Sequence, residues 1–149
     1  MPNEDLIAIP YVLQAGEGVS PSDTATKCSG ETSGGMLTVI ESKTTGGAPW
    51  HIHTREDEFM YVASGVIQVR IAAKTTEVGP GGFISLPRNI PHMWDVVSDE
   101  ATVLMMTIPA MLDKFLAEFH AAPDWPSKND VAAKWGIKFL PPSYDPAGG

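Results

Sequence analysis

The sequence contains one cysteine and no long apolar run. A single cysteine, Cys28, excludes an intramolecular disulfide and a metal site built on several thiolates. No apolar run approaches the ~18 residues that a membrane-spanning helix requires. The first residues carry acidic side chains where a secretory signal carries basic ones, so we expect a protein of the reducing cytoplasm.

Basic residues are also few. Lys and Arg number 10 against 18 Asp and Glu, a formal net charge of −8 with His neutral. The basic residues are scattered along the chain rather than clustered. Because surfaces that bind nucleic acid or anionic membranes need concentrated positive charge, we expect neither partner.

Glycine and proline, by contrast, are abundant, with 14 and 13 among 149 residues. Both interrupt regular structure and favour short strands joined by turns. The length predicts one domain over residues 1–149. Its barrel core is expected at about residues 25–108 and its carboxy-terminal helices at about 110–136.

Short β-branched or aromatic runs alternate with turn residues before Pro109 and predict nine strands. Their ranges are 7–13, 25–28, 36–41, 51–53, 59–63, 66–72, 83–86, 93–97 and 102–108. Strands at this spacing are typical of a sandwich or small barrel. Helical spacing of apolar residues predicts an amphipathic helix from residue 110 and a second helix over 128–135, with Ser127 as its N-cap and Gly136 as its stop.

Ser64-Gly65 lies between two predicted strands and indicates a two-residue hairpin turn. In that register Glu58 lies opposite Ile71 and shares one face with Met60 and Val62, toward the barrel interior. A carboxylate aimed into an apolar interior is costly unless it is protonated, paired or bound to a metal. Glu58 therefore needs a partner.

Three histidines supply that partner. His51 and His53 are two residues apart, which puts both imidazoles on one face of a strand, and His92 begins a later strand. An isolated His-x-His pair is most often two exposed strand residues, but the interior Glu58 and the distant His92 favour a larger pattern. Three imidazoles and one carboxylate suit Zn, Fe, Ni, Cu, Co or Mn.

Two segments resemble the paired motifs of the cupin family. Residues 46–65, GGAPWHIHTREDEFMYVASG, resemble the first motif, and residues 81–92, GGFISLPRNIPH, resemble the second. The resemblance implies an all-β fold, a small double-stranded β-helix or jelly-roll barrel, with two short carboxy-terminal helices. It also implies that one divalent transition metal ion is held by four residues, His51, His53, Glu58 and His92.

The layout outside the motifs is similar to that of single-domain cupins grouped with quercetin dioxygenases. This resemblance implies a metal-dependent dioxygenase acting on a flavonol-like or other enolisable small molecule, with Glu58 as the catalytic base. Two alternatives stay open. One is a redox-neutral isomerase, cyclase or lyase that uses the metal as a Lewis acid, and the other is a non-catalytic cupin that binds a small molecule.

The remaining candidate residues surround this site. Trp94 shares the face of His92 and is predicted either as a wall of the substrate pocket or as a core aromatic. Met60, Val62 and Ile71 complete the predicted pocket. Trp50 precedes the first ligand and is expected to pack on the opposite face.

Other residues near the motifs are expected to take no part in the chemistry. Glu56 and Asp57 are predicted to be solvated neighbours of Glu58, and Arg88 is predicted to brace its turn. His120 is expected at the surface end of its helix.

Phe59 and Tyr61 lie on the outer face of their predicted strand. Two aromatics on an outer face are usually covered. Small cupins commonly pair their sheets, so the resemblance implies a homodimer that buries Phe59 or Tyr61.

Overall fold

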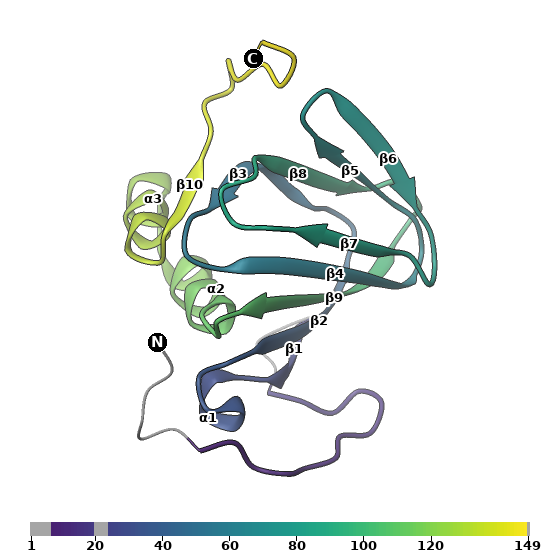
Figure 1. Ribbon diagram of the computed structural model, residues 1–149, viewed down its shortest axis with the longest axis vertical. Coiled ribbons are helices and arrows are strands. Elements are labelled where there is room, and N and C mark those ends of the chain that lie inside the picture. Colours follow the sequence, from purple (N-terminus) through teal and green to yellow (C-terminus); the bar gives the residue numbers. More distant parts are fainter. Residues whose placement is uncertain (1–6, 20–23, 149) are drawn as a thin grey trace.

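The computed structural model describes residues 7–19 and 24–148, and within them ten strands form two five-stranded antiparallel sheets (Figure 1). The first sheet has the order β1 (Thr24–Cys28), β2 (Thr38–Thr44), β9 (Ala101–Ile108), β4 (Asp57–Ser64) and β7 (Phe83–Leu86). The second has the order β10 (Ile137–Phe139), β3 (Ala48–His53), β8 (His92–Val96), β5 (Ile67–Ile71) and β6 (Lys74–Val78). The two sheets form a jelly-roll sandwich, which confirms the predicted fold class.

Eight of the nine predicted strands form, and the strand predicted over residues 7–13 is wrong. That segment runs exposed along the molecule without joining either sheet. Pro10 lies in its middle and has no backbone N–H to donate to a neighbouring strand. The prediction missed β6 and β10, because β6 is a polar, exposed strand without apolar alternation and β10 has only three residues.

The predicted hairpin register between residues 59–63 and 66–72 is also wrong. β4 pairs with β7 and β9, whereas β5 pairs with β6 and β8 in the other sheet. Gly65 carries the chain between the sheets with a φ of 76°. The predicted orientation of the side chains is nevertheless correct. Met60, Val62 and Ile67 are all buried, because alternate residues of both sheets point into the same interior.

Helices α2 (Leu112–Ala121) and α3 (Trp125–Lys134) pack at one end of the sheets, beside β10 (Figure 1). A short helix, α1 (Gly30–Ser33), follows β1. The predicted N-cap of α3 is corrected: Asp124 caps it, and its side chain accepts a hydrogen bond from the backbone N–H of Ser127 at 2.8 Å. Gly136 follows the helix with a φ of 74°, as its predicted stop requires.

The hydrophobic core has two parts. One lies between the sheets and includes Met60, Val62 and Trp94. The other joins Ile40 of β2 to Leu112 and Phe115 of α2, and to α3 and β10. The helices therefore close one end of the sandwich by burying an apolar face against it.

The outer face of β4 and β7 carries aromatic side chains. Phe59 stacks on Phe83 with ring centroids 6.1 Å apart, and Tyr61 and Phe83 are exposed. The homodimer that buries Phe59 or Tyr61 stays a prediction. Among residues 7–19 and 24–148, no helix is long and apolar enough to cross a membrane.

Gly65, where the chain passes from one sheet to the other, yields a prediction about stability. A Cβ on Gly65 would lie 2.3 Å from the carbonyl oxygen of Glu100, and its φ is unfavourable for any other residue. We expect Gly65→Ala to lower the free energy of unfolding by about 2 kcal/mol or more. Gly79→Ala is the control, because a Cβ there meets nothing within 4 Å. Thermal unfolding of both variants measures the difference, and equal melting temperatures would contradict the prediction.

Candidate metal centre

The four predicted ligands converge between the two sheets. His51 and His53 come from β3, and His92 at the start of β8 is the cross-strand partner of His51. Glu58 reaches the same point from β4 in the opposite sheet. One ligand atom from each of the four residues lies within 4.8 Å of the others, and all four side chains are buried.

Each imidazole is oriented by a hydrogen bond at Nδ1. The Nδ1 atom of His51 lies 2.7 Å from the carbonyl oxygen of Pro49, and that of His92 lies 3.0 Å from the carbonyl oxygen of Ile90. A carbonyl oxygen only accepts, so both Nδ1 atoms carry the proton and donate it. The Nε2 lone pair of His51 therefore points into the cluster, and Nε2 of His92 lies 3.2 Å from a carboxylate oxygen of Glu58.

The Nε2 atom of His53 lies 3.1 Å from a Glu58 carboxylate oxygen and 3.2 Å from Nε2 of His51. Burial alone lowers an imidazole pKa, but hydrogen bonds to Glu56 and Glu58 outweigh it and raise the pKa of His53 to about 10. Burial also raises a carboxyl pKa, yet hydrogen bonds from His53 and His92 hold the pKa of Glu58 well below its usual range. Burial and the neighbouring His92 lower the pKa of His51 to about 4.

This arrangement of charge fits a divalent cation. The buried carboxylate of Glu58 is compensated by the protonated ring of His53, whose Nε2 atom lies close to both Glu58 and Nε2 of His51. A cation that takes the place of this proton satisfies the carboxylate and the converging imidazole nitrogens together. Three nitrogens and one oxygen are a donor set for a transition metal ion rather than for Ca²⁺ or Mg²⁺.

The prediction that Glu56 is solvated is wrong, because its side chain is buried. Only 1% of its surface is exposed, and its Oε1 atom accepts a hydrogen bond from Nδ1 of His53 at 2.8 Å. Its other oxygen, Oε2, is buried without a hydrogen-bond partner among the described residues. A carboxylate behind a ligating histidine fixes the ring and raises its basicity. The sequence offered no signal for this role, because Glu56 sits in an acidic turn.

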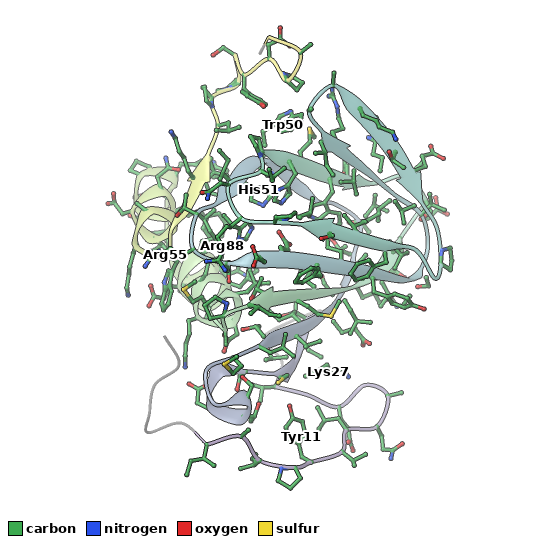
Figure 2. The ribbon with its side chains drawn as sticks, in the orientation of Figure 1. Tyr11, Lys27, Trp50, His51, Arg55 and Arg88 are labelled. Atoms are coloured by element: carbon green, nitrogen blue, oxygen red, sulfur yellow. The ribbon has the colours of Figure 1, made fainter. Side chains whose placement is uncertain are left out.

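The turns around the site are held by residues that stay outside it. Asp57 accepts hydrogen bonds from the backbone N–H and the guanidinium of Arg88, so the predicted bracing role of Arg88 agrees with the structure. Trp50 contacts the ring of Tyr144, with centroids 5.0 Å apart, and points away from His51 (Figure 2). Thr54, just after the first two histidines, binds the carbonyl oxygen of Gly136 at 2.6 Å.

A cavity of about 470 Å³ opens onto the cluster. Its inner end is lined by His51, His53 and Glu58, and Trp94 also lines it. Its outer part is lined by side chains of α2, α3 and β10. A volume of this size falls in the range of sites for small organic ligands.

The other predicted pocket residues lie elsewhere. Met60 and Val62 are fully buried in the core between the sheets. Ile71 packs against that core and lines a separate cavity beside β6. Side chains of the carboxy-terminal segment also line the cavity, among them His120, which is exposed in the last turn of α2, as predicted.

The cupin domain family matches residues 38–109, a segment that holds all four cluster residues. Fold and site together define a jelly-roll protein with a buried His and Glu cluster suited to a divalent metal ion. The chain therefore contains a cupin domain over residues 38–109. A comparison with curated proteins gives no match.

Several solved structures are similar to this chain, and the one with a TM-score above 0.5 shares its fold. KdgF from Halomonas sp. is 19% identical with a TM-score of 0.55, and the match covers 61% of this chain and 81% of that one. An RmlC-like cupin from Shewanella frigidimarina is 18% identical with a TM-score of 0.49, covering 54% and 72%. BH2720 from Bacillus halodurans is 19% identical with a TM-score of 0.49, covering 52% and 65%. At these identities the likeness is one of fold.

The cluster predicts which histidines hold metal. His53→Ala and His92→Ala each remove a converging ligand, so we expect either variant to lose most of its bound metal. His120→Ala is the matched control, because His120 lines the cavity outside the cluster. Elemental analysis of protein purified without added metal measures the effect. Equal metal content in all three variants would overturn the ligand assignment.

Glu56 yields a second prediction. We expect Glu56→Ala to weaken metal affinity by about 10- to 100-fold, because His53 loses the acceptor that orients it. Glu56→Gln keeps an acceptor without the charge, so we expect a smaller loss. Competition with a chromogenic chelator measures both affinities. Asp57→Asn is the control, since Asp57 contacts Arg88 rather than a cluster residue, and an affinity of Glu56→Ala equal to this control would refute the role.

Proposed function

We propose that this protein is a metal-dependent dioxygenase that acts on a flavonol-like or other enolisable small molecule. The observation that supports it is the position of the cluster, with three of its four residues exposed to the inner end of a largely apolar cavity. Four protein ligands leave open positions on a metal ion of coordination number five or six. In this proposal His51, His53, Glu58 and His92 hold the ion, and a redox-active ion supplies electron exchange between an enolate and O2.

Glu58 has a second role in this proposal. As an ionised carboxylate it can accept a proton, and it lines the cavity that an enol hydroxyl would enter. It therefore serves as the base that takes the proton from that hydroxyl. In this proposal Trp94 and the apolar side chains that line the cavity with it would exclude water from the reacting group.

Glu58→Gln separates these two roles. The substitution keeps the shape of the side chain but removes its charge and its capacity as a base. We expect the variant to lose at least about 100-fold in turnover, the usual contribution of a positioned base, while keeping a larger share of its metal. Metal content and turnover are measured on the same preparation. If both fall in proportion, Glu58 is a ligand without a role as base.

Oxygen dependence tests the reaction class. We expect purified protein with its native metal to consume O2 in an oxygen electrode with members of a small panel of flavonols and diketones. Equal conversion of a true substrate without oxygen would contradict the dioxygenase and indicate a redox-neutral isomerase, cyclase or lyase. Binding without conversion in either atmosphere would indicate a non-catalytic cupin.

A further inference from the structure

The carboxy-terminal segment contributes four aromatic side chains to the lining of the cavity. Helix α2 contributes Phe115 and Phe119, helix α3 contributes Trp125, and β10 contributes Phe139. Trp125 is the exposed one among them, with 62% of its surface accessible. All four also lie outside residues 38–109, the part of the chain that matches the cupin domain family.

These rings form a continuous path from the protein surface to the cluster. Trp125 is 62% exposed, and its ring centroid lies 6.3 Å from that of Phe139 and 6.3 Å from that of Phe119. Phe139 is the cross-strand partner of His51, and their ring centroids are 6.2 Å apart. A ligand that enters past Trp125 therefore meets aromatic surface until it reaches the histidines.

Polar side chains of β2 also line the cavity. Ser42, Lys43 and Thr44 of β2 line it, and the ammonium of Lys43 lies 3.3 Å from a carboxylate oxygen of Glu100. An anionic or cationic tail finds no strong partner in this arrangement. A neutral planar group fits it, with one face on the rings and one edge toward the hydroxyls.

We propose that Phe119, Trp125 and Phe139 form an aromatic subsite that selects substrates carrying a neutral, planar aromatic group next to the part that reaches the metal. Trp125 is the specificity-determining residue, because its exposed ring stands at the entrance. The inference rests on the proposed function only in taking the cluster as the place where the reacting group binds. Binding at the subsite requires neither oxygen nor turnover.

The test compares two probes that share a metal-binding oxygen pair. The first is 3-hydroxyflavone, which carries planar aromatic rings, and the second is acetylacetone, which carries none. Titration calorimetry on Zn²⁺-loaded protein measures both affinities without redox chemistry. We expect Trp125→Ala to weaken 3-hydroxyflavone binding about tenfold and to leave acetylacetone binding unchanged. Trp125→Phe is expected to recover most of the loss.

The controls distinguish a loss of ligand selectivity from damage to the fold. The cap of α3 uses the side chain of Asp124, so Trp125→Ala leaves it in place, and zinc content of the variant verifies that the cluster is intact. Phe83→Ala removes an equally exposed ring, 61% accessible, from β7 and is expected to change neither affinity.

Three results would overturn the subsite: unchanged 3-hydroxyflavone affinity in Trp125→Ala, equal weakening of both probes, or failure of the wild-type protein to bind 3-hydroxyflavone. Failure of the dioxygenase proposal appears separately, as oxygen-independent conversion. That result leaves the difference between the two probes unaffected.

Discussion

A carboxylate buried between two β-sheets is the constraint on which the rest of the site depends. Glu58 projects from one sheet into an interior otherwise filled by Met60, Val62 and Trp94, where an isolated charge would be strongly unfavourable. The opposite sheet supplies imidazole side chains from two adjacent strands, β3 and β8. The cross-strand pairing of His51 with His92 places both rings against the carboxylate, so sheet register and charge compensation specify the same geometry.

The surroundings keep this cluster in one arrangement. Backbone carbonyls hold the rings of His51 and His92, and Glu56 holds that of His53, so each Nε2 atom faces the centre. The carboxy-terminal segment adds a further restraint, because Gly136 binds Thr54 directly after the ligand strand. The sheets, the turn that holds Glu56 and the segment after α3 thus all hold the cluster, which is how a folded scaffold pre-organises a site.

The same carboxy-terminal segment connects the fold to ligand choice. Helices α2 and α3 bury an apolar face against β2 and β10. Aromatic side chains of the same segment line the cavity. The cluster lies within the matched cupin domain, whereas these aromatic side chains lie outside it. Cupin folds host many reactions, so such additions are where specificity is expected to differ between members.

The sequence by itself determined the strand-rich class, the inward face of Glu58 and the four-residue cluster, because strand periodicity and motif spacing are local properties. Only the tertiary structure decided which strands pair. Ser64-Gly65 reads as a hairpin turn, yet Gly65 sends the chain into the other sheet beside Glu100. The burial of Glu56 and the aromatic entrance likewise depend on contacts between residues far apart in the chain, such as Phe139 with His51, which no local pattern encodes.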